Sequence, residues 1–325
     1  MKGIYIVKKV LLLLLALIAV LLPLSSCRDS AADDETITIV TTTFPEYDWT
    51  RNILGEAPDG VELILLTENG TDLHSFQPTV THIATLSECD IFICTGGVSD
   101  SWVDDALASV PAKNRTVIKL MSLLSEEQKL VEQSQHHNTQ HHEHEDEYDE
   151  HIWLSVKNAK SFCRTITDVL CEKLPEHSDV YAQNCESYIE ALDELDAAFA
   201  QSVTAAETKT LLFADRFPFS YLTHDYGITC YAAFPGCSSE TEASFETVAF
   251  LAERVDALAL PAVVVLENAD LDLAETVIAT TKAKTARIVT MNSLQSISKY
   301  EIENGATYLV TMKNNLDALC LALNK

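Results

Sequence analysis

Two sets of short apolar runs recur along the chain, and each run is followed by a stretch with helical periodicity. The first set comprises residues 36–42, 61–66, 90–95 and 116–120, and the second comprises residues 210–214, 228–233, 261–267 and 287–291. Continuous apolar strands that alternate with helices indicate parallel sheets covered on both faces. We therefore predict an α/β protein with two similar lobes, each built on a four-stranded, mainly parallel sheet.

A long helix is predicted between the two sets of strands. The segment from Ser178 to Ala206 contains no Gly or Pro, and its apolar residues recur at spacings of three and four. These residues are Tyr181, Cys185, Tyr188, Leu192, Leu195 and Phe199. The spacing places them in one stripe, and about 28 residues at 1.5 Å each span roughly 40 Å. We interpret this segment as a rigid helix joining the lobes, with an ordinary packed helix as the alternative.

The amino terminus has the pattern of a lipoprotein signal peptide. Three lysines precede an apolar run at residues 10–22, which is shorter than the roughly 20 residues of a membrane-spanning helix. The following Leu-Ser-Ser-Cys resembles the bacterial lipobox, in which the cysteine is lipidated and becomes the first residue. We predict a signal peptide at residues 1–26, a tether at 27–35 after lipidated Cys27, and a body outside the cytoplasm. An uncleaved amino-terminal anchor is the alternative.

The remaining chain divides into an amino-terminal lobe at residues 36–175, a linking helix at 176–206 and a carboxyl-terminal lobe at 207–325. The whole chain of 325 residues is strongly acidic, with 49 Asp and Glu against 22 Lys and Arg and a formal net charge of −27. Such a surface repels phosphate backbones, so nucleic acid is excluded as a partner, and it favours cations.

Eight cysteines follow Cys27, at positions 89, 94, 163, 171, 185, 230, 237 and 320. No Cys-x-x-Cys pair occurs among them, which argues against a zinc-thiolate site. Cys94, Cys230 and Cys320 lie in apolar runs and are interpreted as small core residues. A disulfide between Cys230 and Cys237 is left open.

A histidine-rich and acidic run, QHHNTQHHEHEDEYDEH, occupies residues 135–151. Residues 135–150 have almost no apolar content, so we expect a loop that is disordered without metal. Neutral imidazoles bind zinc, nickel and copper, and the neighbouring carboxylates favour a cation. The predicted low-affinity ligands are His136, His137, His141, His142 and His144. A merely solvated polar loop is the alternative.

Two other histidines adjoin predicted ordered elements. His151 closes the run and enters the apolar sequence Ile152-Trp153-Leu154, just before a predicted helix at residues 156–170. His74 follows the strand at residues 61–66, and ligands in parallel α/β sheets bind beyond the carboxyl ends of strands. Both are candidates for a tight metal site, although a single histidine of this kind is more often a surface residue.

These motifs together resemble the solute-binding component of zinc and manganese ABC importers. The resemblance is carried by Asp72-Leu73-His74, by Cys89-Asp90 with Gly96-Gly97 after the strand, and by the run ending His151-Ile152-Trp153-Leu154. It covers nearly all of the mature chain and implies two α/β lobes, one long rigid helix and a single transition-metal ion in the cleft. The histidine-rich insertion resembles the zinc branch, and His74 and His151 match the two amino-lobe ligands.

The carboxyl lobe departs from the family pattern. The family has a His or Glu five residues before a Tyr, and counting back from Tyr221 gives Arg216, which cannot bind a cation. The adjacent Asp215 is our predicted third ligand, with a surface ion pair between Asp215 and Arg216 as the alternative. The additional candidate ligands are Glu267, His224 and Asn292, the last standing where many members have Asp.

The prediction for function is a lipid-anchored extracytoplasmic protein that captures Zn²⁺, with Mn²⁺ as the alternative ion, and delivers it to the permease of an ABC importer. It would make and break no covalent bond. A metal-buffering surface adhesin is one rival, and a zinc hydrolase is another. The chain has neither His-Glu-x-x-His nor Gly-x-Ser-x-Gly, which argues against the hydrolase.

Overall fold

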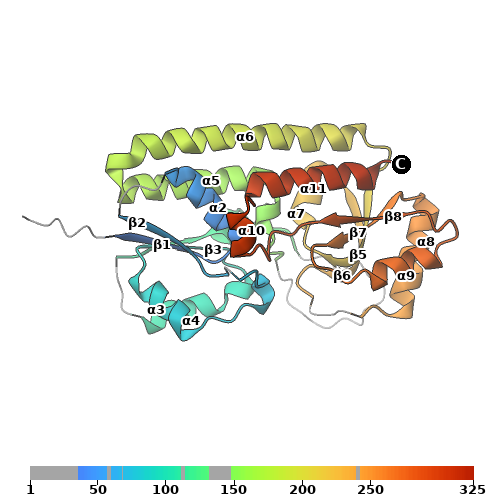
Figure 1. The fold of residues 1–325 in the computed structure, drawn as a ribbon, viewed down its shortest axis with the longest axis horizontal. Helices are drawn as coiled ribbons and strands as arrows, with labels where there is room; N and C mark the ends of the chain where they lie inside the picture. The colour runs from blue at the N-terminus through green and yellow to red at the C-terminus, as the bar shows by residue number, and fades with distance from the viewer. Residues whose placement is uncertain (1–35, 57–59, 68, 111–113, 132–147, 239–241) are drawn as a thin grey trace, which may run out of the picture. The chain divides into compact units, whose positions relative to one another are not determined.

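Each of the eight predicted strands is present in the computed structural model, which describes residues 36–325 apart from 57–59, 68, 111–113, 132–147 and 239–241 (Figure 1). The predicted signal peptide with Cys27 and the five loop histidines lie outside the described residues. Ile37–Lys325 form one compact unit, and none of its described helices is long and apolar enough to cross a membrane.

The first sheet belongs to the amino-terminal lobe. Its strands are β1 (Ile37–Thr41), β2 (Val61–Leu65), β3 (Ile91–Cys94) and β4 (Thr116–Lys119), in the order β2-β1-β3-β4 with every pairing parallel. Helices α2 (Phe44–Leu54) and α5 (Val156–Lys173) cover one face, while α3 (Val80–Glu88) and α4 (Trp102–Ser109) cover the other. Both faces are therefore buried, which explains why the strands are continuous apolar runs.

The second sheet repeats this plan in the carboxyl-terminal lobe. Its strands are β5 (Thr210–Phe217), β6 (Thr229–Pro235), β7 (Ala262–Leu266) and β8 (Arg287–Met291), in the order β6-β5-β7-β8, again all parallel. Helices α8 (Phe245–Leu258) and α9 (Asp272–Thr280) cover one face, and α11 (Tyr308–Leu323) packs on the other. The short helices α7 (Ser220–Tyr226) and α10 (Lys299–Glu303) complete the lobe.

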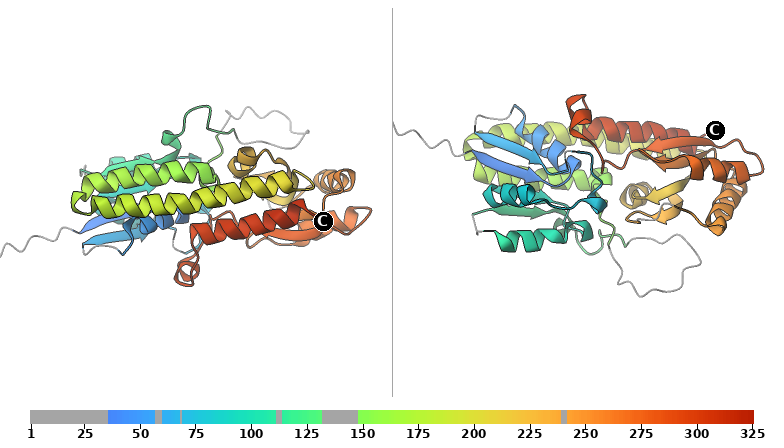
Figure 2. Two further views of the ribbon diagram at one scale, coloured as in Figure 1. Left: turned by 90° about the horizontal axis from the view of Figure 1, so that it is seen from above. Right: turned by 60° about the horizontal axis from the view of Figure 1, so that its bottom comes forward.

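The predicted long helix is α6, Ser178–Ala205, with 28 residues. Every residue of the predicted apolar stripe is buried, from Tyr181 to Phe199. The helix packs against α5 and α2 of the first lobe and against α11 of the second (Figure 2). A single continuous helix bound to both lobes restricts their relative motion, as predicted from its position in the chain.

The two lobes share a buried aromatic core. Trp49 of α2 contacts Phe162 of α5 and Tyr308 of α11, with ring centroids 5.9 and 5.2 Å apart. The Tyr308 hydroxyl donates to the carbonyl of Trp153 at 2.7 Å, and the Trp153 indole N–H donates to the carbonyl of Ser293 at 2.9 Å. Trp153 lies in the 3₁₀ helix η4 (Ile152–Leu154), so these bonds fix this element of the amino-terminal lobe to the carboxyl-terminal lobe.

The cysteines agree only in part with their predicted role as core residues. Cys94 and Cys230 are buried, but Cys320, which lies on α11, is partly exposed. Cys230 is a free thiol, so the Cys230–Cys237 disulfide is not formed.

Glu46 is a buried acid that links the segment after β1 to the segment after β3, at the carboxyl ends of the strands. It is the third residue of α2, and its side chain closes a capping box with Thr43. It accepts hydrogen bonds from the amides of Thr42 and Thr43, each at 3.0 Å, and from the Thr95 hydroxyl at 3.0 Å. Burial, followed by the nearby Asp100 carboxyl, raises the pKa of Glu46 to about 8.

The raised pKa predicts that the metal-free protein loses stability as the solution changes from mildly acidic to mildly alkaline. The folded state holds the Glu46 proton more tightly than the unfolded state, so this contribution is lost as pH rises from about 4.5 through about 8. Glu46→Gln stays neutral and keeps an acceptor for the Thr42 and Thr43 amides. The free energy of unfolding of the variant, measured with urea, should rise relative to that of the wild type between about pH 5 and about pH 8.5. The exposed Glu62→Gln is the control, and an equal difference at both pH values for Glu46→Gln would contradict the account.

Candidate metal centre

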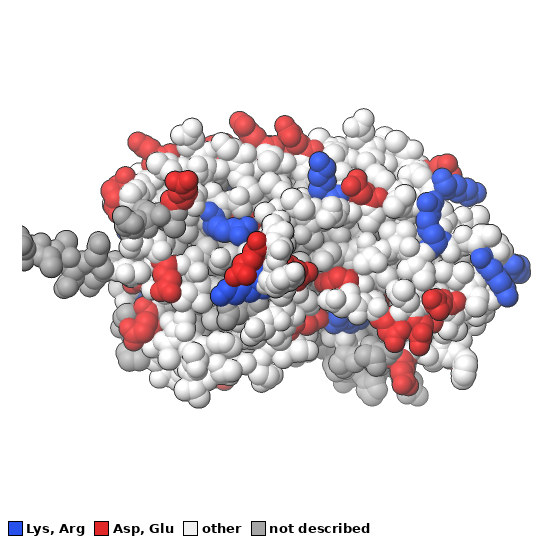
Figure 3. All heavy atoms as spheres, in the orientation of Figure 1, with Lys and Arg blue, Asp and Glu red and all other residues white. Residues whose placement is uncertain are grey.

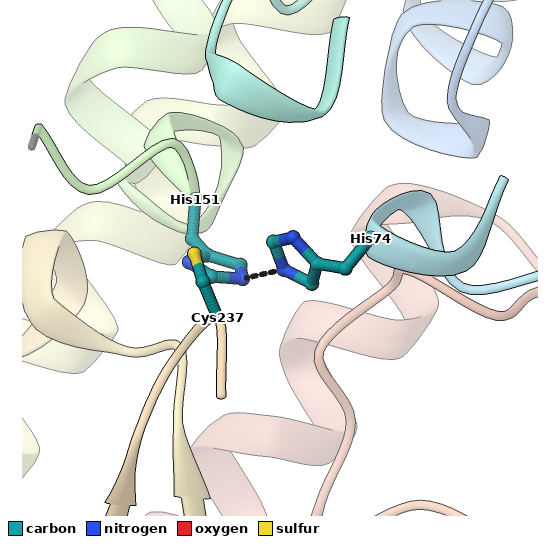
Figure 4. A group of neighbouring side chains, drawn as sticks. All are labelled: His74, His151 and Cys237. Atoms are coloured by element: carbon teal, nitrogen blue, oxygen red, sulfur yellow. Dashed lines mark hydrogen bonds between the residues drawn. The ribbon is translucent and has the colours of Figure 1, made fainter. Parts of the chain in front are cut away.

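His74, His151 and Cys237 form one cluster (Figure 4). His74 lies in the 3₁₀ helix η1 (Leu73–Ser75) after β2, and His151 directly precedes η4. Cys237 follows β6 and reaches the cluster from the carboxyl-terminal lobe. Their nitrogen and sulfur ligand atoms all lie within 4.8 Å of one another. The two sequence-predicted histidines are therefore adjacent, together with a thiol that the sequence analysis did not include.

The loop that carries His74 is fixed by two local features. Gly70 has a φ of +69°, and a β-carbon there would come within 2.9 Å of the Ser296 carbonyl oxygen, so this position requires glycine. Asp72 caps η1 by accepting from the backbone N–H of His74 at 3.0 Å. The second oxygen of Asp72 accepts from the Arg216 guanidinium at 3.1 Å, which ties the loop to the carboxyl-terminal lobe.

His151 is completely buried. Its ring lies edge-on to the ring of Trp153, with centroids 5.3 Å apart. Asp149 accepts from both the backbone N–H and the Nδ1 of His151, at 2.8 Å each. The aromatic core shared by the lobes therefore fixes the position of the His151 ring, and the hydrogen bond to Asp149 fixes its orientation.

The partners of the two Nδ1 atoms determine the tautomers. The Ser99 hydroxyl donates to the Glu150 carboxylate at 2.6 Å, so it accepts from Nδ1–H of His74 at 2.8 Å. Glu150 itself lies 3.3 Å from the same Nδ1. In His151 the Nδ1–H donates to the Asp149 carboxylate. Each neutral imidazole therefore presents the lone pair of its Nε2.

These two Nε2 atoms face each other at 3.1 Å. Two lone pairs at this distance repel unless a proton or a cation lies between them. Two nitrogen ligands at 2.0–2.1 Å from a tetrahedral zinc ion are about 3.3 Å apart, close to the observed separation. Imidazoles whose second nitrogen donates to a carboxylate are also the usual arrangement around protein-bound metals.

Glu150 is a buried acid at the edge of the cluster. Burial raises its pKa, but hydrogen bonds from His74 and Ser99 outweigh this effect, so the pKa is below its usual value and the group is a carboxylate. Gly97 makes room for it, because a β-carbon at that position would collide with the Glu150 side chain. A pocket of about 570 Å³, lined by His74, Glu150 and Cys237 among others, opens onto the cluster from one side.

The structure does not bring Asp215 into this cluster. Its carboxylate accepts from the backbone N–H of Arg216 at 2.7 Å and from that of Leu266 in β7 at 3.0 Å. These contacts occur at an irregularity in the register of β5 between Phe213 and Arg216. Arg216 pairs with Asp72 rather than with Asp215. The side chain of Asp215 thus holds the bulged strand to its neighbour.

The additional candidates also have other contacts. Glu267 accepts from the backbone N–H and the hydroxyl of Ser293, and burial raises its pKa. The Asn292 side-chain oxygen accepts from the backbone N–H of Leu294 at 2.8 Å. His224 lies on α7 and lines a separate pocket. Like Asp215, none of the three belongs to the described cluster.

Sequence reasoning missed the thiol and did not single out the two carboxylates beside the histidines. Asp149 and Glu150 were counted only as acids of the histidine-rich run, although an acid two residues before a histidine is a detectable local signal. For Cys237 the signal is weaker: it follows Pro235-Gly236 at the carboxyl end of a strand, where ligands of parallel sheets bind.

Comparisons with known proteins identify the family. Residues 39–322 match the ZnuA family, described as "Zinc-uptake complex component A periplasmic". The chain is 31% identical to the zinc-binding lipoprotein AdcA of Streptococcus pneumoniae over 314 residues, an alignment that covers 96% of this chain and 60% of that protein. The chain thus spans less than two thirds of the length of this relative.

Two further comparisons cover the other protein almost completely. The high-affinity zinc uptake system protein ZnuA of Bacillus subtilis is 27% identical over 296 residues, which is 91% of this chain and 90% of that protein. The Zn(II)-bound ZnuA-like domain of S. pneumoniae AdcA is 27% identical, with a TM-score of 0.72 over 89% of this chain and 100% of that domain. Because the family match spans most of the chain, this protein belongs to the ZnuA family of periplasmic zinc-uptake components.

Proposed function

We propose that this protein captures a zinc ion between its two lobes and delivers it to the membrane permease of an ABC importer. The observation that carries the proposal is the pair of Nε2 atoms 3.1 Å apart, each belonging to an imidazole whose Nδ1 is held by a hydrogen bond, to Ser99 for His74 and to the buried Asp149 for His151. Neutral imidazole suits zinc, whereas manganese prefers oxygen ligands, so the donor set favours Zn²⁺ over the alternative Mn²⁺.

The mechanism is binding and release without covalent chemistry. Asp149 and the pair Ser99–Glu150 keep both imidazoles in the tautomer that can bind a metal. Acidic side chains are spread over the face of the molecule that Figure 3 shows, and the net charge of −27 attracts cations toward the protein. The ion would then be presented to the permease while a lipid on Cys27 keeps the protein at the membrane, outside the cytoplasm.

The rivals from the sequence are less well supported. The family is one of zinc-uptake binding components, not of enzymes, which argues against a zinc hydrolase. An adhesin or passive buffer built on the histidine-rich run needs no ordered pair of histidines between two lobes. The buried His151 and its fixed partners favour transport as the primary function.

The first prediction for this function concerns the two histidines. A ligand that binds only the folded state raises stability by RT ln(1 + [L]/Kd), about 4 kcal/mol at a thousandfold excess over Kd. Zinc should therefore raise the melting temperature of the wild type, and much less that of His74→Ala combined with His151→Ala. His177→Ala combined with His224→Ala is the matched control and should respond like the wild type. An equal zinc response in the His74/His151 variant would refute the assignment.

The second prediction separates the cluster from the histidine-rich run. Val131 and Tyr148 pair in an isolated antiparallel bridge, so deleting residues 135–147 leaves ends that a short linker can join. Because ordering a polar chain costs roughly 1–2 kcal/mol per residue, sites in the run should be weak and fill after the tight site. Isothermal titration of the deletion protein with zinc should lose the weak sites and keep the tight one. Loss of the tight site with the run would favour the buffer or adhesin.

A further inference from the structure

We propose that Cys237 supplies the carboxyl-lobe ligand of the metal site, as a thiolate, so that zinc is held by two imidazoles and one sulfur. The inference rests on the proposed function, because it takes His74 and His151 as the other two ligands. It assigns to Cys237 the role that the sequence analysis gave to Asp215.

The position of the thiol agrees with this role. Its Sγ lies within 4.8 Å of the ligand nitrogens of both histidines, and it comes from the opposite lobe (Figure 4). In a tetrahedral zinc site with Zn–N of 2.0–2.1 Å and Zn–S of about 2.3 Å, sulfur and nitrogen are about 3.5 Å apart. A shift of about 1 Å by the loop after β6 would close the site around an ion.

Gly236 allows this loop to lie against the histidine. A β-carbon at position 236 would stand 3.1 Å from Cε1 of His151 and 2.8 Å from the carbonyl oxygen of Phe217. Any larger residue would therefore push the loop away from the cluster. The glycine before Cys237 brings the backbone close enough for the short cysteine side chain to reach the site.

The carboxyl-terminal lobe offers no better donor among its described residues. The carboxylate of Asp215 accepts from the backbone of β7, and that of Glu267 accepts from the backbone N–H of Ser293. The side-chain oxygen of Asn292 likewise accepts from a backbone N–H. Arg216, at the position where the family resemblance implies a ligand, pairs with Asp72 instead. A lobe that has arginine at that position needs another donor if it is to bind the ion, and Cys237 is the residue in reach.

Glu150 lies beside the thiol before metal arrives. The Cys237 S–H donates to the Glu150 carboxylate across 3.9 Å, and the same oxygen is 3.3 Å from Nδ1 of His74. When zinc binds, the sulfur–zinc bond forms and the thiol proton leaves to solvent. A thiolate with two imidazoles is a soft donor set, which selects zinc over the oxygen-preferring Mn²⁺ and Mg²⁺.

Cobalt spectroscopy of the purified full chain tests the inference, because a cobalt–thiolate bond gives a sulfur-to-metal charge-transfer band in the near ultraviolet. Co²⁺ alone is the probe. The wild type should show this band in addition to the visible bands of the ion. Cys237→Ser should lose it, and its zinc affinity should fall at least about 10–100-fold, the loss caused by removing even an outer-shell partner. Cys320→Ser is the matched control and should keep both the band and the affinity, and Asp215→Asn should keep the band.

The outcomes separate this inference from the proposed function. Cobalt binding that depends on His74 and His151 but gives no sulfur band, or a band that persists in Cys237→Ser, overturns the thiolate and leaves zinc capture intact. Absence of tight metal binding in the wild type overturns both. Alkylation of the wild type provides a measurement without a variant: zinc should slow the modification of Cys237 by iodoacetamide, followed by mass spectrometry, and an unchanged rate contradicts the inference.

Discussion

The opposition of two imidazole lone pairs is the constraint on which the site depends. Each ring is fixed at Nδ1 by a hydrogen-bonded partner, and neither can turn away without breaking that bond. The facing Nε2 atoms are 3.1 Å apart, an arrangement that is unfavourable without a positive charge between them. Because both imidazoles are already oriented, neither has to be ordered when the cation binds, which lowers the entropic cost of capture.

The fold maintains this opposition through the core shared by both lobes. Trp153 lies two residues after His151. The indole N–H and the backbone carbonyl of Trp153 are each hydrogen-bonded to the carboxyl-terminal lobe. Asp72 caps the helix of His74 and pairs with Arg216 across the lobes. Together with α6, these contacts mean that both lobes, and not one loop alone, determine the distance between the two histidines.

The strands and the long helix could be predicted from the sequence because their signal is periodic. Buried strands are continuous apolar runs, and the stripe from Tyr181 to Phe199 has the period of a helix. The capping box of Thr43 and Glu46 was not among the sequence predictions, and its consequence for the pKa of Glu46 depends on burial that the sequence does not reveal. The adjacency of His74 and His151 followed from their positions beside ordered elements and from the family resemblance.

The carboxyl-lobe side of the site could not be predicted in the same way. The rule that zinc thiolates occur as Cys-x-x-Cys pairs applies to ligands on one turn, whereas here the thiol and the histidines come from different lobes. Asp215 was predicted to follow a strand at residues 210–214, but β5 continues to Phe217, and its bulge turns the Asp215 carboxylate toward the β7 backbone. The close approach of the Gly236 backbone to His151 is visible only in three dimensions.

Zinc K-edge X-ray absorption of the one-to-one zinc complex tests the central claim most directly, because it reports the ligand atoms in the native protein. The account predicts imidazole nitrogens at about 2.0–2.1 Å, with the outer-shell scattering typical of histidine rings, and one sulfur at about 2.3 Å. A first shell of oxygen alone without imidazole scattering would contradict the histidine site. A shell with two imidazoles but no sulfur would retain that site and remove Cys237 from it.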